Sequence, residues 1–406
     1  MIKIDSVRFL LSVSRSLDFT YTGLLDHHKR VAYLSQALGR ALGLSEPELW
    51  QLFKTAIIHD AGATTWKEKN MLLEFEVNDG PRWAHCRKGY EFAHNIPTLD
   101  MSADEILVHH DRWMGGNPSG FVKDRIPLAG RIIHLVDRID VLIQNNVPIL
   151  QQRDRIMHEV KTKAGTEFDP NLVELVHNIM QRDSLWLDLV SPWLGERLMD
   201  ALPANIGLGE VSLVDLARLF ARVVDAKSPF TYRHSKGVAS SAVILGQELG
   251  FNNEQCELLE AAALLHDLGK VTIPEAILDK NGPLTANEFN FIKQHTYYTY
   301  WLLKPVTKDL PLAQWAAFHH ERLDGNGYPF QKVEAELSLG ARIVAAADVF
   351  TALREDRPYR LGMQWPAIEK IFQEKVADRA LDKEVVETLL ASREKLDIMW
   401  EQLSKN

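Results

Sequence analysis

Hydrophobic positions along the chain follow the period of an α-helix. Val238, Ala242 and Leu245 recur at helical spacing. The run 254–265 consists of good helix formers, and residues 343–353 are typical of a buried helix. No segment shows the sustained period-two alternation, bounded by turn residues, that strands would require. The pattern therefore predicts an all-α protein.

The same order of polar residues occurs twice, about 210 positions apart. The corresponding residues are His27 and His234, His59-Asp60 and His266-Asp267, His85 and His295, His109-His110 and His319-His320, and Asp137 and Asp348. An internal repeat of this kind indicates two copies of one folding unit. Pro203, Gly207 and Gly209 are breaker residues at the join. We expect two tandem helical bundles, at residues 1–205 and 206–406.

Composition argues against a nucleic-acid-binding protein and against a membrane protein. The 406 residues carry a formal net charge of -9, which argues against DNA or RNA binding through a basic face. No apolar run approaches the roughly 20 residues of a membrane helix, so we expect no membrane insertion. Two cysteines, Cys86 and Cys256, make no disulfide framework and predict a cytoplasmic protein. Cys86 follows His85 directly, and we interpret it as a small buried thiol.

The repeated residues are of the types that bind metals. Imidazole nitrogens and carboxylate oxygens are ligands for divalent transition metals. A lone histidine is more often a surface or core residue, but seven ligand types in one order, present twice, reverse that expectation. After His320 a glycine-rich loop follows, in which Gly325 and Gly327 let the backbone approach a ligand and Pro329 stiffens the loop end.

This combination resembles the HD-GYP phosphodiesterases, which hydrolyse cyclic dinucleotides, over roughly residues 212 to 393. The resemblance implies an HD-type helical core in each half and a metal site in the second. The implied metal ligands are His234, His266, Asp267, His295, His319, His320 and Asp348. Asp267 takes the role of bridge between two metals. Mixed ligation favours iron or manganese, with zinc, nickel or magnesium as alternatives. Phe230 replaces a glutamate that helps to hold a third metal in some members, so we expect two divalent ions.

The resemblance also implies a substrate site. Lys270 and Asp267 are the implied catalytic residues. Lys270 would contact the scissile phosphate and offset the negative charge that develops on it. Substrate contacts are further implied for Gly327, Tyr328, Pro329, Arg357 and Arg360. Arginine suits phosphate through its forked donors. Arg322 belongs either to the substrate site or to a structural ion pair with a nearby acid.

The first copy keeps the ligand types but not the cations. Ala63 stands at the position of Lys270, and Asn146 and Ile149 stand at those of Arg357 and Arg360. We expect a degenerate domain that regulates the second domain or packs against it. Two alternatives stay open for its histidines, an inert remnant or a second metal cage. That cage would consist of His27, His59, Asp60, His85, His109, His110 and Asp137.

The function implied by the resemblance is hydrolysis of a 3′,5′-cyclic dinucleotide to a linear 5′-phosphorylated dinucleotide, through a metal-bridging hydroxide. The substrate is 3′,3′-cyclic GMP-AMP or cyclic di-GMP, with a preference for the former because a degenerate unit precedes the active one. The alternatives are an HD-type phosphohydrolase of other nucleotides and a non-catalytic scaffold that binds cyclic dinucleotides or contacts their synthases. A homodimer is also left open.

Overall fold

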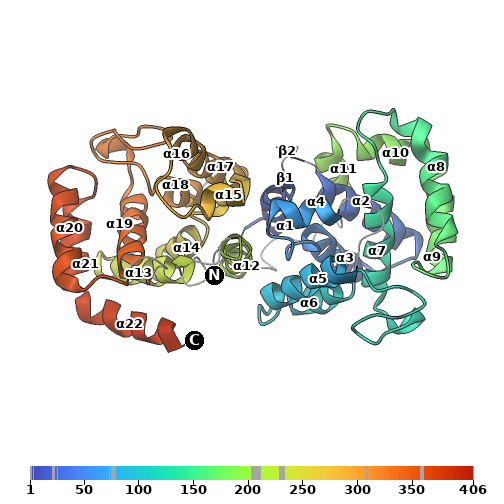
Figure 1. The fold of residues 1–406 in the computed structure, drawn as a ribbon, viewed down its shortest axis with the longest axis horizontal. Coiled ribbons are helices and arrows are strands. Elements are labelled where there is room, and N and C mark those ends of the chain that lie inside the picture. The colour runs from blue at the N-terminus through green and yellow to red at the C-terminus, as the bar shows by residue number, and fades with distance from the viewer. Residues whose placement is uncertain are drawn as a thin grey trace. The chain divides into compact units, whose positions relative to one another are not determined.

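The structure, a computed structural model, describes residues 2, 4–20, 23–24, 26–72, 74, 79–202, 212–227, 234–306, 310–356 and 361–405. The chain divides into two compact units (Figure 1). The first unit is Val13–Glu210, and the second is Met1–Ser12 together with Val211–Asn406. The fold is all-α, as the hydrophobic pattern predicts. Pro203, Gly207 and Gly209 lie outside the described residues.

The first unit is built of helices and one short hairpin. Its elements are η1 (Ser14–Ser16), β1 (Phe19–Thr20), β2 (Gly23–Leu24), α2 (His27–Ala41), α3 (Glu46–Ile58), α4 (Trp66–Leu72), α5 (Asp79–Ala93), α6 (Asp100–Leu107), η2 (Lys123–Arg125), α7 (Leu128–Val141), α8 (Ile149–Thr162), α9 (Pro170–Ile179), α10 (Asp183–Leu189) and α11 (Leu194–Asp200). The antiparallel strands pair Phe19 with Leu24 and Thr20 with Gly23. Helix α2 packs against α3 and α7 and so forms the centre of this unit.

The second unit repeats this arrangement. Its elements are α1 (Ser6–Val13), α12 (Leu213–Asp225), α13 (His234–Glu248), α14 (Asn253–Leu264), η3 (Leu268–Thr272), α15 (Glu275–Leu278), α16 (Ala286–Ile292), α17 (Gln294–Leu303), α18 (Leu312–Ala317), η4 (Glu334–Glu336), α19 (Leu339–Arg354), α20 (Trp365–Ala377), α21 (Lys383–Ala391) and α22 (Arg393–Lys405). Helix α13 packs against α14 and α19, as α2 packs against α3 and α7. Among the described residues, no helix is long and apolar enough to cross a membrane.

Helix α1 belongs to the second unit, although our division of the sequence assigned it to the first domain. Phe9 is fully buried, and its ring lies 6.2 Å from that of Phe220 in α12. The Ser12 hydroxyl donates to the carbonyl of Leu302 at 2.6 Å. The apolar face of α1 is therefore part of the core of the second unit, where its burial contributes to stability. Sequence order alone gives no sign of this, because the contacts span more than 200 residues.

Candidate metal centres and substrate site

The structure brings together the seven predicted ligands of the second unit. They come from five places in the fold: the first residue of α13 (His234), the turn after α14 (His266 and Asp267), the start of α17 (His295), the turn after α18 (His319 and His320) and the middle of α19 (Asp348). Helix ends and the turns that follow them direct these side chains to one region. Three overlapping clusters of ligand atoms result, each with all its atoms within 4.8 Å of one another.

Asp267 lies between two groups of histidines. One carboxylate oxygen, Oδ2, is 3.2 Å from Nε2 of His266. The other, Oδ1, is 3.4 Å from Nε2 of His295 and 4.0 Å from Nε2 of His319. Asp348 completes the first group, with Oδ1 3.1 Å from Nε2 of His234. A carboxylate that offers one oxygen to each side has the geometry of a bridge between two cations.

The histidines are oriented as ligands. His266, His295 and His319 each bond through Nδ1 to the carbonyl three residues earlier, at 2.7, 2.6 and 2.8 Å. Since a carbonyl only accepts, Nδ1 carries the proton and the Nε2 lone pair faces the cluster. Nε2 of His295 and Nε2 of His319 are 3.3 Å apart, with no proton to share. Converging lone pairs and carboxylates need a cation, so the donor set fits divalent metal ions.

The pKa shifts of the histidines in this cluster also fit a site for cations. Burial lowers the pKa of His295 to about 3, which keeps this imidazole neutral and able to bind a metal. Burial also opposes charge on His234, but hydrogen bonds to Asp348 and Glu355 outweigh it and raise the pKa of His234 to about 10. In the absence of metal, the buried carboxylates thus attract a proton to His234. Bound metal ions would supply that positive charge instead.

The Gly-Tyr-Pro loop lies beside this cluster. A Cβ on Gly327 would come within 2.4 Å of the Cα of Glu321, so only glycine fits there. The Glu321 carboxylate holds the loop by accepting hydrogen bonds from the backbone N–H of Phe330 and of Lys332, at 2.7 and 2.9 Å. The ring of Tyr328 is 4.9 Å from that of His320. The loop therefore places an aromatic side chain next to a predicted metal ligand.

Two of the predicted cations are described. Nζ of Lys270, in η3, lies 2.5 Å from Oδ2 of Asp267, and its side chain is 26% exposed. Arg322 makes two hydrogen bonds to Asp324, at 3.0 and 2.7 Å, and one to the carbonyl of Asp378 at 2.9 Å. These contacts match the structural ion pair, one of the two roles left open for Arg322. Arg357, Arg360 and Phe230 lie outside the described residues.

Two glycines, Gly62 and Gly269, allow a close backbone approach in each centre that the sequence did not predict. A Cβ on Gly269 would lie 1.9 Å from the carbonyl oxygen of His295, and a Cβ on Gly62 equally close to that of His85. Each glycine thus lets the turn after a His-Asp pair lie against the helix of the third histidine. The signal was present in the sequence, because Gly62 and Gly269 follow the 207-residue repeat.

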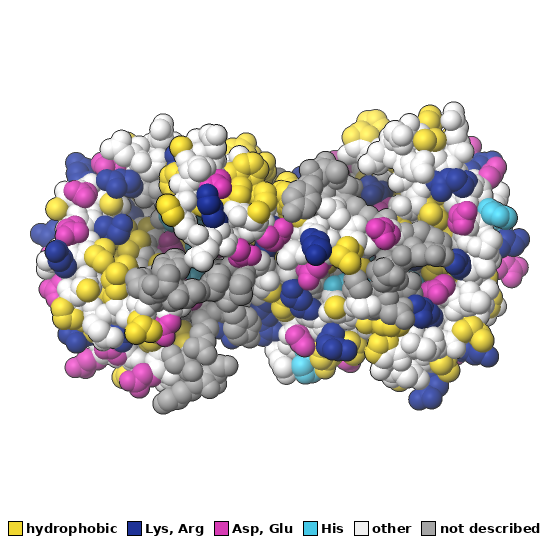
Figure 2. Space-filling view, in the orientation of Figure 1, with side chains coloured by type: hydrophobic (Ala, Val, Ile, Leu, Met, Phe, Trp, Pro, Cys, Tyr) yellow, Lys and Arg dark blue, Asp and Glu magenta, His cyan; other side chains and the backbone are white. Residues whose placement is uncertain are grey.

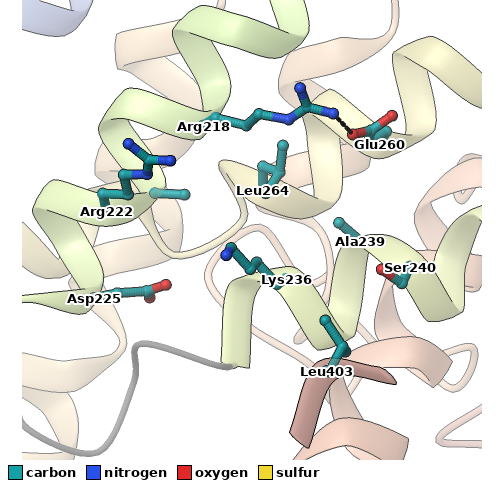
Figure 3. Close-up of a pocket in the computed structure, with 10 residues that line it drawn as sticks. Arg218, Arg222, Asp225, Lys236, Ala239, Ser240, Glu260, Leu264 and Leu403 are labelled. Carbon is teal, nitrogen blue, oxygen red and sulfur yellow. Dashed lines mark hydrogen bonds and ion pairs between the residues drawn. The ribbon is translucent and has the colours of Figure 1, made fainter. Parts of the chain in front are cut away.

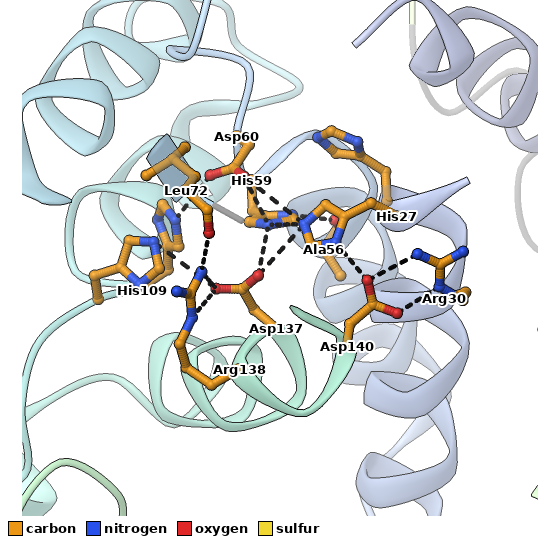
Figure 4. Close-up of polar contacts among 12 residues, drawn as sticks. His27, Arg30, Ala56, His59, Asp60, Leu72, His109, Asp137, Arg138 and Asp140 are labelled. Atoms are coloured by element: carbon orange, nitrogen blue, oxygen red, sulfur yellow. Dashed lines mark hydrogen bonds and ion pairs between the residues drawn. The ribbon is translucent and has the colours of Figure 1, made fainter. Parts of the chain in front are cut away.

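The first unit assembles its seven residues in the same way (Figure 4). Asp60, His85, His109 and His110 form one buried cluster, and the other three form a second. The three are His27, His59 and Asp137. The buried thiol of Cys86 lies 3.6 Å from Nε2 of His85, at the edge of the first cluster.

The second unit also contains a polar cavity of about 230 Å³, which is separate from the ligands (Figure 3). Arg218, Arg222 and Lys236 line it, and Arg218 bonds Glu260 at 2.9 Å. Asp225, another lining residue, accepts a hydrogen bond from Ser235 at 2.7 Å. Ser235 directly follows His234, so the wall of the cavity supports the start of α13.

An aromatic surface borders the Gly-Tyr-Pro loop. Figure 2 shows hydrophobic side chains gathered on the second unit over α16 and α17, where Phe289 is 43% and Trp301 47% exposed. The ring of Phe289 is 6.0 Å from that of Tyr328. Lys293 lies over both rings, with Nζ 5.0 Å from the centre of Phe289 and 5.8 Å from that of Tyr328. Aromatic rings and a cation therefore lie beside the predicted metal ligands.

Comparison with known proteins agrees with this geometry. Models of the HD domain match residues 218–385 and 24–142, and so cover both units. Over 389 residues the chain is 33% identical to the 3′3′-cGAMP-specific phosphodiesterase 1 of Vibrio cholerae, covering 93% of this chain and 89% of that protein. The chain therefore belongs to the HD-domain phosphodiesterases.

Two further relatives differ in how much of the chain they match. The crystal structure of a cyclic GMP-AMP-specific phosphodiesterase of Vibrio cholerae superimposes with a TM-score of 0.65 at 27% identity, covering 97% of this chain and 98% of that one. The cyclic di-GMP phosphodiesterase response regulator RpfG of Xanthomonas campestris is 35% identical over 192 residues, which cover 47% of this chain and 50% of that protein.

Proposed function

We propose that the second unit hydrolyses a 3′,5′-cyclic dinucleotide to a linear 5′-phosphorylated dinucleotide. The observation that carries the proposal is the position of Asp267, with one oxygen toward His266 and the other toward His295. The seven residues of the cluster would hold two metal ions, which would supply an activated water at neutral pH and neutralise phosphate charge. Iron or manganese fits the mixed nitrogen and oxygen donors best.

The side chains around the cluster would then position the substrate. Lys270 would reach the phosphate by exchanging its ion pair with Asp267 for one with the substrate, since its side chain is partly exposed. Tyr328 and Phe289 offer ring faces to a base. As water adds to phosphorus, the bond from phosphorus to the ribose 3′-oxygen breaks. The 3′-oxygen takes up a proton, and the phosphate stays on the 5′-oxygen.

As the preferred substrate we propose 3′,3′-cyclic GMP-AMP over cyclic di-GMP. The relatives that match along almost the whole chain, through both units, are named for cyclic GMP-AMP. RpfG, named for cyclic di-GMP, matches about half of the chain. The combination of the first unit with the second thus supports this preference.

The proposal is tested by incubating the metal-loaded full chain with 3′,3′-cyclic GMP-AMP, cyclic di-GMP and cyclic di-AMP, and by separating the products chromatographically. We expect a linear dinucleotide with a 5′-phosphate, formed fastest from 3′,3′-cyclic GMP-AMP. His266→Ala serves as the inactive control and His59→Ala as its counterpart in the first unit. Binding without turnover would favour a scaffold. Activity that is lost with His59→Ala but kept with His266→Ala would show that the first unit, and not the second, carries out the reaction.

A further inference from the structure

We propose that the first unit holds a divalent metal centre of its own, in a closed cage that stabilises this unit and turns over no substrate. The proposal goes beyond the reaction assigned to the second unit. It concerns residues that the reaction does not use and decides between the two alternatives that the sequence left open for them.

Asp60 lies at the centre of the cage, between two groups of histidines. Its Oδ1 is 3.1 Å from Nε2 of His85 and 3.4 Å from Nε2 of His109. Its Oδ2 is 3.5 Å from Nε2 of His59 and 3.8 Å from Nε2 of His27. Each oxygen serves one group, as in the second unit. The first unit therefore retains the complete bridging arrangement and not merely the residue types.

The histidines of the first unit also have hydrogen-bond partners at Nδ1 that orient their rings. His59 and His109 bond through Nδ1 to the carbonyl three residues earlier, at 2.8 and 2.6 Å, so their Nε2 lone pairs face inward. Nδ1 of His27 lies 2.7 Å from Asp140, whose carboxylate Arg30 holds at 2.5 and 3.1 Å (Figure 4). A carboxylate behind a histidine is the usual support of a metal-binding imidazole.

Without an ion this arrangement is costly. Nε2 of His27 and Nε2 of His59 lie 3.3 Å apart. Within the described part of the chain, the buried atoms Oδ1 of Asp60, Nε2 of His110 and Oδ1 of Asp137 have no hydrogen-bond partner. Buried polar atoms that are left without a partner destabilise a fold. Metal ions bound at the two clusters of this unit would satisfy all three atoms.

Two ligand positions are more deeply buried in this cage than in the one of the second unit. His110 is 1% exposed, whereas its counterpart His320 is only half-buried. The side chain of Asp137 is 1% exposed, compared with 13% for Asp348. Metal sites that stabilise a fold are closed, whereas catalytic sites keep a position open to substrate. At His110 and Asp137 the first cage is closed, although Asp60 and His85 are slightly more exposed than Asp267 and His295.

Arg138 closes it. Its guanidinium donates twice to Oδ2 of Asp137, at 2.9 and 2.7 Å, and also to the carbonyls of Leu72 and Glu74, at 3.1 and 2.7 Å. Four hydrogen bonds fix this buried side chain, which leaves Oδ1 of Asp137 for a metal. Lys270 in the second unit makes a single ion pair on a partly exposed stem. Lys270, with one ion pair, suits a reaction, whereas Arg138, with four hydrogen bonds, suits a structural site.

The test uses the full chain and a matched pair of isosteric variants, Asp60→Asn and Asp267→Asn. Each protein is stripped with a chelator, reloaded separately with Mn²⁺ and with Zn²⁺, and measured for metal content and for amide hydrogen exchange. We expect each variant to lose part of the wild-type metal content and the double variant to lose nearly all of it. In Asp267→Asn, reloading should slow exchange in α3 and α7 at least tenfold.

Asp267→Asn decides the matter even if Asp60→Asn folds poorly, because its first unit is unaltered. Unchanged exchange in α3 and α7 when Asp267→Asn is reloaded with either metal would overturn the proposal. So would a wild-type metal content in a folded Asp60→Asn. Hydrolysis of any cyclic dinucleotide by reloaded Asp267→Asn would show that the first cage is open to substrate. These readouts do not depend on activity of the second unit, so a failure of its proposed function would be seen separately.

Discussion

Gly269 lies against the main-chain carbonyl of His295, so closely that a Cβ would be 1.9 Å from the oxygen. This contact joins the turn that carries Asp267 to the helix that carries the third histidine. Because the obstacle is backbone, no side-chain rotation can relieve it. The same relationship between Gly62 and His85 indicates that the ligand geometry of each unit depends on this approach.

Gly269→Ala should therefore separate the two ligand groups. We expect a loss of stability on the order of 2–3 kcal/mol and a lower metal content, because the turn must move to admit the methyl group. Urea denaturation and elemental analysis measure the two effects. Gly80→Ala is the control, since a Cβ at Gly80 meets no atom within 4 Å. A stable Gly269→Ala with full metal content would show that the approach is dispensable.

Asp267→Ala should abolish turnover and reduce metal content. The substitution removes both oxygens that face the two histidine groups, while the surrounding helices retain their own packing. Circular dichroism should retain its helical signal, and elemental analysis should report the lost ions. Hydrolysis at the wild-type rate would contradict the bridging role.

Lys270→Ala should slow the chemical step by roughly 10²–10³, the usual effect of removing one electrostatic donor from a transition state. Metal content should stay unchanged, since the amine is not a metal ligand. Single-turnover kinetics with saturating substrate isolate this step. Lys280→Ala, which removes a surface ion pair with Glu288, is the matched control and should keep the wild-type rate. Normal turnover in Lys270→Ala would exclude the role.

Phe289→Ala should weaken substrate binding about tenfold, because stacking of one base on an aromatic ring is worth about 1–3 kcal/mol. The change should raise KM and leave kcat almost unaltered, since Phe289 contacts Tyr328 and not the ligands. Trp301→Ala controls for the general loss of an exposed ring on the same surface. An equal effect of both substitutions would point to a loss of folding and not of stacking.

Sequence reasoning reached the fold class because helical periodicity and the repeat are local or regularly spaced signals. It grouped the fourteen candidate ligands, seven in each unit, for the same reason. Sequence reasoning did not find the residues that hold the candidate ligands in place. Asp140 and Glu355, which lie behind His27 and His234, are not at equivalent positions of the repeat. Arg138 belongs to no motif of the sequence, and only the structure reveals its four hydrogen bonds.

The membership of α1 in the second unit has a consequence for the order in which the protein is made. Its residues are synthesised before Val13–Glu210, whereas Phe220 and Leu302, which they contact, are synthesised after the whole of that stretch. The first unit can fold while the chain is still growing, whereas the second must wait for its later helices and then pack them against a segment that precedes the whole first unit. A fragment that begins at Val211 would lack α1 and leave Phe220 uncovered, so α1 supplied as a separate peptide should rescue its folding.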